Sequence, residues 1–280
     1  MRRLALLLAL ALLLALALLL ALSGAHAETR LLALNVGKGD ALIVQSGGAT
    51  LLIDTGKAKA SDKLLDALER LNIEYLDAVF ITHTDKDHTG GLKALRKSDV
   101  TIGEIYASKY YPESSYEKHP AVKTAEKLAK QVAFLGAGDE LRFGDATLHV
   151  LAPIDEIPDN EDDNSLVMLL DSPDGRILLC GDMEFAEEEM LLDSGADVKC
   201  DVLKVPNHGD SDACGPALIQ ACGARAAIIS TSSEDKPGTP DPGVTANLKQ
   251  AGAAVWVTQD YEFGILAVLD AGTLRVEGQN

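Results

Sequence analysis

The chain has 280 residues, of which 47% are hydrophobic and only 4% aromatic, so it is long enough for one large domain or two small ones. Without Arg2 and Arg3, 23 basic residues remain against 43 acidic ones, a charge of about −20. A field of this sign repels polyanions and weakens non-specific attraction to a phosphate backbone. A nucleic-acid partner is therefore disfavoured, although it stays open.

The first 27 residues have the pattern of a secretory signal peptide. Arg2 and Arg3 precede an uninterrupted Leu/Ala run over residues 4–22, and small residues with an Ala-x-Ala cleavage site follow it, ending at Ala27. The run is also long enough to span a bilayer, so an uncleaved N-terminal membrane anchor is the alternative. In both cases we expect residues 28–280 to form one extracytoplasmic domain, secreted or membrane-anchored, since no linker rich in Pro, Gly or Ser divides them.

From Glu28 onward, short apolar strands alternate with turns and helices. Residues 31–36, 41–44 and 49–53 predict an opening β-meander. The apolar face of residues 59–71 predicts a helix laid over a sheet, and residues 76–81 predict a buried strand. Further strands are expected at residues 101–107, 147–151, 176–180, 202–206, 224–230, 255–258 and 264–269. Further helices are expected at residues 92–96, 120–130, from 184 and at 244–251.

The most informative stretch follows the strand at residues 76–81. It places His83, Asp85, Asp87 and His88 within six residues. Two imidazoles and two carboxylates this close together can surround one or two divalent cations, Zn or Mn. The alternative is a solvated polar turn, which a lone His-x-Asp would favour but this cluster after a buried strand does not.

This stretch resembles the first metal motif of the metallo-β-lactamase superfamily, His-x-His-x-Asp-His, with Asp85 at the second histidine position. The variant is similar to the hydrolase domain of ComEC-type DNA-uptake proteins. Residues 36–40, Val-Gly-Lys-Gly-Asp, resemble a signature of that branch, with Lys38 where glutamine is common. Asp54 begins a further family motif, Asp-x-Gly. We expect Asp40 and Asp54 to hydrogen-bond loops or to orient metal ligands rather than to bind metal.

Later segments resemble the remaining motifs of the family. Asn164 opens an Asn-Ser-Leu-Val segment where a histidine is usual, and it offers only a neutral oxygen. Gly181-Asp182 matches the fourth motif. Residues 207–210, Asn-His-Gly-Asp, stand where His-His-Gly-Ser is usual, and Thr239 replaces the histidine of Gly-His-Pro. The resemblance implies that Asn207, Asp210 and Thr239 face the substrate.

The resemblance covers nearly all of residues 30–270 and implies an α/β fold, the four-layer αββα sandwich, with one or two divalent ions at one edge. Carried over position by position, it implies three groups of ligands. His83 and Asp85, with help from Asn164, would hold one ion; Asp87, His88 and His208 would hold the other; Asp182 would bridge them. A divalent ion lowers the pKa of bound water, and Asp87, or alternatively Asp85, would accept the proton.

The leading hypothesis is an extracytoplasmic metal-dependent hydrolase of phosphoester bonds, because relatives with this form of the first motif include nucleases and phosphodiesterases. The acidic charge and the missing histidines at Asn207 and Thr239 favour a small phosphodiester over long DNA. A lactone or β-lactam hydrolase is the alternative within the family. A catalytically silent binding module that retains metal is the alternative from another class. The membrane is a partner only if the N-terminal segment stays attached.

Several residues outside the motifs carry weaker signals. The four residues Tyr106, Tyr110, Tyr111 and Tyr116 predict either a lid with an aromatic wall or, more commonly, a loop packed against a sheet edge. His119 is expected at the surface and His149 on a strand, and neither is expected to bind metal.

The four cysteines are Cys180, Cys200, Cys214 and Cys222. They could pair in an oxidising compartment, but their spacing does not give the connectivity. Cys180 ends an apolar strand and is expected to be a buried thiol.

Overall fold

The computed structural model describes residues 28–110 and 117–280. The predicted signal peptide or anchor, and Tyr111 and Tyr116 of the predicted lid, lie outside these residues. In the two described ranges, no helix combines the length and the apolar character needed to cross a membrane.

The first sheet has eight strands and combines antiparallel with parallel pairing. The expected meander is present as β1 (Thr29–Leu34), β2 (Leu42–Ser46) and β3 (Ala49–Ile53). Three parallel strands continue the sheet from β3: β4 (Tyr75–Ile81), β5 (Thr101–Ser108) and β6 (Val132–Leu135). The last two strands of the chain, β14 (Gly264–Asp270) and β15 (Thr273–Gln279), extend it from β1 in antiparallel order.

The second sheet has seven strands, which follow one another in chain order. Pairing is antiparallel through β7 (Glu140–Phe143), β8 (Ala146–Ala152), β9 (Val167–Ser172) and β10 (Gly175–Leu179). It is parallel from β10 through β11 (Val202–Lys204), β12 (Ala226–Ile229) and β13 (Ala254–Val257). The carboxyl ends of β10, β11 and β12 therefore meet at one edge.

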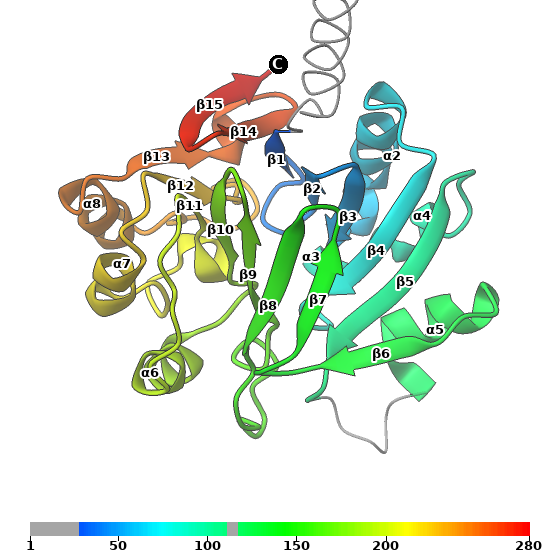
Figure 1. Ribbon diagram of the computed structural model, residues 1–280, viewed down its shortest axis with the longest axis horizontal. Coiled ribbons are helices and arrows are strands. Elements are labelled where there is room, and N and C mark those ends of the chain that lie inside the picture. Colours follow the sequence, from blue (N-terminus) through cyan, green and yellow to red (C-terminus); the bar gives the residue numbers. More distant parts are fainter. Residues whose placement is uncertain (1–27, 111–116) are drawn as a thin grey trace, which may run out of the picture.

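Helices cover the outer face of each sheet, as Figure 1 shows. The first sheet carries α2 (Ser61–Arg70), α4 (Leu92–Leu95) and α5 (Pro120–Lys127). The second sheet carries α6 (Phe185–Asp193), α7 (Pro216–Cys222) and α8 (Pro242–Gln250). Short helical turns lie in the loops: η1 (Ala58–Ala60), α3 (Lys86–Thr89), η3 (Pro206–Gly209) and η4 (Thr258–Asp260).

Both faces of the central strands are buried, which explains their continuous apolar runs. In β1, Leu31 and Ala33 point into the core between the two sheets, whereas Leu32 and Leu34 pack under the helices of the first sheet. The layers are therefore helix, sheet, sheet and helix, and the predicted four-layer αββα sandwich is confirmed.

Some local predictions are wrong. The strand β9 was not predicted; it begins at Val167, and Asn164 belongs to the preceding loop. The strands β6, β7 and β15 were not predicted, since each is only partly buried and two of them carry charged residues. His119 is 2% exposed rather than at the surface, and its Nδ1 accepts a hydrogen bond from the Ala121 N–H at the start of α5.

The two described tyrosines of the predicted lid, Tyr106 and Tyr110, pack against the rest of the protein. Tyr106 stacks on Phe80 with ring centroids 4.9 Å apart, and the Tyr110 hydroxyl donates to the Ile154 carbonyl over 3.2 Å. Both contacts agree with loop packing rather than a lid. His149 is a strand side chain, as predicted, and pairs with Glu140.

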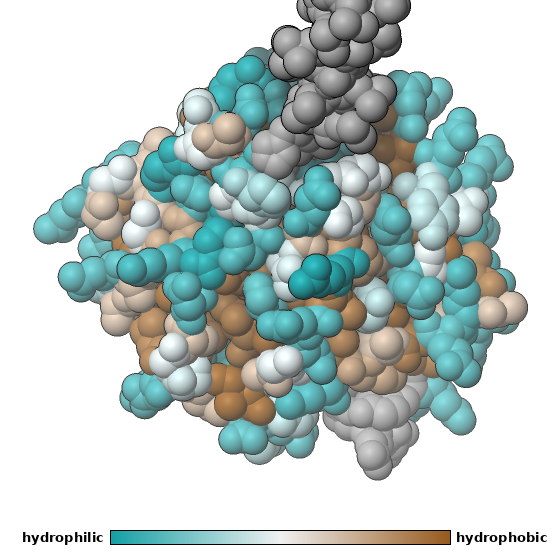
Figure 2. All heavy atoms as spheres, in the orientation of Figure 1, coloured by the Kyte–Doolittle hydropathy of each residue, from teal (hydrophilic) through white to brown (hydrophobic). Residues whose placement is uncertain are grey.

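The four cysteines are buried free thiols in the structure. Burial raises the pKa of Cys214 to about 12, so this thiol stays protonated and unreactive. Figure 2 shows hydrophilic side chains spread over the visible face with hydrophobic ones between them, as expected of a chain in which 24% of the residues are charged.

Candidate metal centre

Four acidic and imidazole side chains emerge where parallel strands end. Asp54 follows β3, His83 follows β4, Asp182 follows β10, and His208 lies in η3 after β11. Because the carboxyl ends of parallel strands share one edge of a sheet, and the two sheets pack face to face, these side chains meet. His88 joins them from α3, at the end of the loop after β4.

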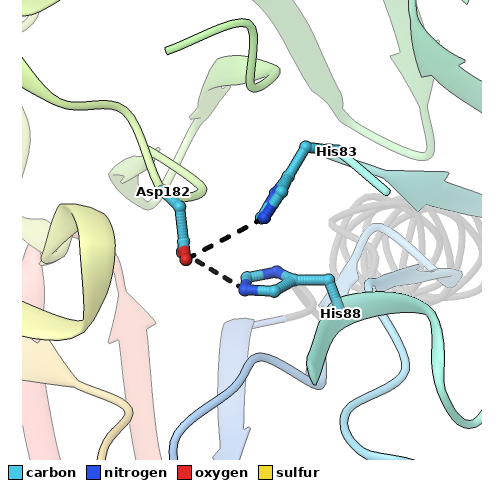
Figure 3. Close-up of side chains that lie close together, drawn as sticks. All are labelled: His83, His88 and Asp182. Atoms are coloured by element: carbon cyan, nitrogen blue, oxygen red, sulfur yellow. Dashed lines mark ion pairs between the residues drawn. The ribbon is translucent and has the colours of Figure 1, made fainter. Parts of the chain in front are cut away.

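Three imidazoles converge on the Asp182 carboxylate. Asp182 Oδ1 lies 3.2 Å from His88 Nε2, and Asp182 Oδ2 lies 2.9 Å from His208 Nε2 and 3.9 Å from His83 Nε2. Figure 3 shows His83 and His88 both directed at this carboxylate. The two histidines His88 and His208 also approach each other, with their Nε2 atoms 3.2 Å apart. All four side chains are at most 4% exposed.

Two buried atoms in this group have no hydrogen-bond partner, namely His83 Nε2 and Asp182 Oδ1. Buried polar atoms in proteins are nearly always paired, so each exception requires an explanation. Imidazole nitrogens and carboxylate oxygens are the donors that divalent transition-metal ions prefer. The residues present therefore fit a divalent cation.

The ligand-type atoms form overlapping groups, within each of which they lie no more than 4.8 Å apart. The groups are His83, His88 and Asp182; Asp87, His88 and His208; His83, Asp85 and Asp162; and Asp40, Asp54 and His88. The structure thus brings together six of the seven residues that the sequence predicted as ligands. The first three groups share members, as two adjacent cation positions would require.

Carboxylates and carbonyls behind the histidines fix their orientation. Asp54 Oδ2 lies 2.7 Å from His88 Nδ1, and both Asp54 oxygens accept hydrogen bonds from Thr82. The Ser230 carbonyl lies 2.8 Å from His208 Nδ1. When Nδ1 donates to such an acceptor, Nε2 is left as the free donor atom for a metal.

A buried ion pair lies behind His208. Lys204 Nζ is 2.9 Å from Asp40 Oδ2, and both side chains are at most 1% exposed. Asp40 Oδ1 is 3.9 Å from His208 Nδ1. The sequence interpretation missed Lys204, although a lysine inside the apolar strand β11 was a signal for it.

The electrostatics of the centre keep two of its carboxylates, Asp182 and Asp87, ionised. Burial alone would raise the pKa of Asp182, but the charges of His208 and His88 hold it well below its usual range. Burial likewise opposes the ionised form of Asp87, and His88, Lys38 and His208 outweigh it and lower the pKa.

The histidines respond in opposite directions. Burial lowers the pKa of His88, but Asp182 and Asp54 raise it well above its ordinary value. Burial and the charge of His88 lower the pKa of His83. His83 is therefore neutral at pH 7, which is the form in which imidazole binds a metal.

Asn164, which the sequence predicted as a helper ligand, makes its side-chain hydrogen bonds within its own loop, so its role as a ligand stays a prediction. Its Oδ1 accepts from the Ile157 N–H over 3.0 Å, and its Nδ2 donates to the Ile157 and Asn160 carbonyls. The amide is committed to its own loop. Asp162, two residues earlier, reaches His83 instead, with Oδ1 3.5 Å from His83 Nε2.

The three predicted substrate-facing residues are also engaged inside the protein. Asn207 Nδ2 donates to Glu184 and Asp212. Asp210 pairs with Lys236. The Thr239 hydroxyl contacts Thr231 Oγ1 and donates to the Lys236 carbonyl. All three side chains are buried, and their role toward a substrate stays a prediction.

Lys38 is a further residue whose role the sequence did not predict. Its Nζ lies 3.4 Å from Asp87 Oδ2 at the edge of the centre, and its side chain is 19% exposed. Burial opposes its charge, but Asp182 and Asp87 outweigh that effect and raise the pKa of Lys38. Lys38 therefore carries a positive charge beside the candidate metal centre.

Comparison with known proteins assigns a family to most of the chain. Residues 34–233 match the family model described as the metallo-beta-lactamase superfamily. The chain is 27% identical over 223 residues to ComE operon protein 3 of Bacillus subtilis, which covers 72% of this chain and 28% of that protein. It is 26% identical over 203 residues to Recombination protein 2 of Haemophilus influenzae, covering 71% of this chain and 24% of that protein. The chain thus spans about a quarter of the length of these relatives.

Solved structures show the same fold. The metallo-beta-lactamase fold protein YhfI from Bacillus subtilis aligns with a TM-score of 0.55 at 16% identity, over 86% of this chain and 100% of that chain. CmlA, a diiron beta-hydroxylase from Streptomyces venezuelae, aligns with a TM-score of 0.57 at 14% identity, over 80% of this chain and 52% of that chain. At this identity the likeness concerns the fold alone.

Proposed function

Since the chain belongs to the metallo-β-lactamase superfamily, we propose that it is a metal-dependent hydrolase of phosphoester bonds that acts outside the cytoplasm. The observation that carries the proposal is the convergence of His83, His88 and His208 on Asp182, with two buried donor atoms left without partners. The extracytoplasmic location rests on the sequence pattern of residues 1–27 alone.

The ligands divide between two positions. His83 and Asp85 lie on one side, Asp87, His88 and His208 lie on the other, and Asp182 stands between them. A divalent ion bound there supplies Lewis acidity and makes water a nucleophile near neutral pH. Asp54 and the Ser230 carbonyl hold two of the imidazoles in place, so little reorganisation is needed during the reaction.

A carboxylate at the edge of the centre would act as the general base that accepts the proton from water. Asp87 is the better candidate because its lowered pKa keeps it ionised and its Oδ2 lies beside His208 and Lys38. Asp85 is the alternative and is more exposed. A positioned general base of this kind contributes about 100- to 10,000-fold to a reaction rate.

Lys38 supports an anionic substrate. A lysine ammonium beside the centre is suited to a phosphate oxygen, whereas a neutral lactone carries no charge in its ground state for the ammonium to bind.

A nucleic-acid phosphodiester is the second candidate. It is supported by relatives whose names refer to competence and recombination. Against long DNA stands the net charge of about −20 on residues 28–280, which repels a polyanion. A small phosphodiester therefore remains the preferred substrate.

The test combines metal analysis with a substrate panel. The purified chain is stripped with a chelator, reloaded with Mn²⁺ or Zn²⁺, and assayed on bis-p-nitrophenyl phosphate, single-stranded DNA, a chromogenic β-lactam and a lactone. We expect one or two ions per chain and metal-dependent hydrolysis of the small phosphodiester. Turnover of the lactone or β-lactam alone would support the other hydrolase class, and bound metal without any turnover would support a binding module. Absence of binding at micromolar metal would end the proposal.

Lys38→Met sharpens the substrate assignment. We expect it to raise KM for the anionic phosphodiester about tenfold while Lys93→Met, on α4, leaves it unchanged. An unchanged KM in Lys38→Met would show that the Lys38 ammonium does not bind the phosphate group of the substrate.

A further inference from the structure

The acidic loop of residues 154–163 contributes one side chain that the known motifs do not explain. We propose that Asp162 is a metal ligand, which completes a cation position made of one imidazole and three carboxylates: His83, Asp85, Asp162 and Asp182. This inference rests on the proposed function only in requiring that the centre binds divalent metal. It adds a ligand and a metal preference to that centre.

The first observation is the environment of His83. Its Nδ1 lies 3.1 Å from Thr82 Oγ1 and 3.3 Å from Ser165 Oγ, so the ring is held from behind. Its Nε2 is buried and unpaired, and faces Asp162 Oδ1 at 3.5 Å and Asp182 Oδ2 at 3.9 Å. A buried nitrogen that faces two carboxylates without a hydrogen bond is suited to bind a cation together with them.

The second observation is that the loop is built around Asp162. Asp163 Oδ1 accepts from the N–H groups of Glu184 and Glu187, which ties the loop to the start of α6. Asn160 Nδ2 donates to Asp163 and Glu184. The polar atoms of Asn160 and Asp163 are therefore bonded within the loop and to the start of α6. Asp162 instead turns its carboxylate toward His83 and remains 32% exposed.

The loop is also connected directly to the strand-end segment that carries His83. The Leu166 N–H donates to the Thr82 carbonyl over 3.0 Å, and the Thr84 hydroxyl donates to Glu161. The backbone on both sides of Asp162 is therefore held close to His83 by these two hydrogen bonds. First-sphere ligands in metalloproteins are held by such outer contacts.

The donor sets of the two positions differ in chemistry. The group at Asp162 joins one imidazole, His83, with the carboxylates of Asp85 and Asp162, whereas the group at Asp87 joins two imidazoles, His88 and His208, with one carboxylate. Asp182 would be shared by both positions. Carboxylates favour Mn²⁺ and Mg²⁺, while imidazole favours Zn²⁺. The Asp162 position should therefore prefer Mn²⁺ and release it more readily than the histidine-rich position releases its ion.

The experiment counts Mn²⁺ on the full-length chain. Chelator-treated protein is titrated with Mn²⁺ by calorimetry, and bound metal is measured by mass spectrometry after gel filtration. We expect two ions in the wild type, and in Asp162→Ala the loss of one ion with the other bound at unchanged affinity. Glu156→Gln, an exposed acid in the same loop, is the matched control and should keep both ions. Asp162→Glu should restore the second ion in part.

The outcomes separate the two proposals. If Asp162→Ala, folded by circular dichroism, binds as many ions as the wild type with the same affinities, the assignment of Asp162 is wrong and the proposed function stands. The same holds if the wild type binds one ion and Asp162→Ala does not change it. If the wild type binds no divalent metal, both proposals fail.

Discussion

The candidate metal centre has two halves that are built in different ways. The histidine half consists of Asp87, His88 and His208, and its two imidazoles are fully buried. Asp54, the Ser230 carbonyl and the Asp40–Lys204 pair stand behind them. The carboxylate half consists of His83, Asp85 and Asp162, and its two carboxylates are exposed or partly exposed on loops.

The difference shows how a single centre can combine a fixed part and an adjustable part. Side chains of the histidine half are held by the same contacts that hold the core, so changes there should affect stability as well as metal affinity. Carboxylates at the surface contribute to few internal contacts, so changes there should affect metal binding with little effect on folding. Four variants test this division.

The largest effect is expected for Asp182→Ala, because this carboxylate contacts the histidines of both halves. We expect turnover of the phosphodiester to fall at least about 1,000-fold, which corresponds to about 4 kcal/mol in the transition-state barrier. Metal content should fall in both halves while circular dichroism shows a folded chain.

Asp193→Ala, at an exposed position at the end of α6, is its control and should retain full activity. If the Asp182→Ala variant loses metal from only one half of its centre, the two halves bind metal independently of each other. Unchanged turnover would mean that the reaction takes place elsewhere.

The histidine half can be tested through folding with Lys204→Met. This change leaves Asp40 as a buried charge without its partner, since Lys204 Nζ is 2.9 Å from Asp40 Oδ2. We expect the free energy of unfolding to fall by about 3–5 kcal/mol, measured by urea denaturation. Asp40→Asn in the same chain removes the isolated charge and should recover part of the loss.

Lys249→Met replaces an exposed lysine at the end of α8 and should change the unfolding free energy by less than about 0.5 kcal/mol. A similarly small effect in Lys204→Met would break the proposed link between the histidine half and the core.

Asp54→Asn tests orientation within the histidine half. It weakens the acceptor of His88 Nδ1 directly and reaches His83 only through Thr82, whose Oγ1 donates to Asp54 and lies 3.1 Å from His83 Nδ1. We expect about 10- to 100-fold weaker binding of the tighter ion, measured by competition with a chelator, and a smaller effect on the second ion. Asp66→Asn, on the exposed face of α2, should bind both ions as the wild type does. Equal weakening of both ions would contradict the division.

Much of the fold followed from local sequence. The strand that precedes His83 ends in a buried apolar run, residues 78–81. Asp182 and His208 likewise lie in loops that follow buried apolar strands, β10 and β11. Parallel strands then bring these loops to one edge without any further information. That these residues bind metal remains a prediction.

The side-chain orientations and ion pairs that could not be predicted from the sequence depend on contacts between segments far apart in the chain. Whether Asn164 or Asp162 turns toward His83 is decided by hydrogen bonds from α6 to Asp163, about 20 residues away along the chain. Lys204 is visible as a charge in an apolar strand, but its partner Asp40 lies in the first meander loop. Edge strands such as β7 alternate partly exposed residues, so their apolar signal is weak.

The smallest effect concerns the anchor of the acidic loop and depends on pH. Glu187 is fully buried on α6, and its Oε1 accepts from the Ile154 N–H at the start of that loop. Burial raises the pKa of Glu187 from its ordinary value of 4.5 to about 7, and the hydrogen bond from Ile154 only partly opposes this.

The sign of the pH effect follows from this shift. The folded state binds the Glu187 proton more tightly than the unfolded state does, so the contribution to stability is complete below pH 4.5 and is lost as the pH rises through 7. Glutamine keeps the acceptor for Ile154 and carries no charge. Glu187→Gln should therefore be more stable than the wild type at pH 8, by about 1–2 kcal/mol, and no more stable at pH 5.

Urea denaturation of the metal-loaded chain between pH 5 and pH 8 measures this difference. Glu189→Gln, on the exposed face of the same helix, should follow the wild type at every pH. A difference between Glu187→Gln and the wild type that stays constant with pH would mean that the loop anchor is not ionised in this range. Metal affinity of the histidine half should be the same in all three proteins, because Glu187 contacts only the loop of the carboxylate half among the segments that form the centre. A change there would show that the two halves are coupled through α6.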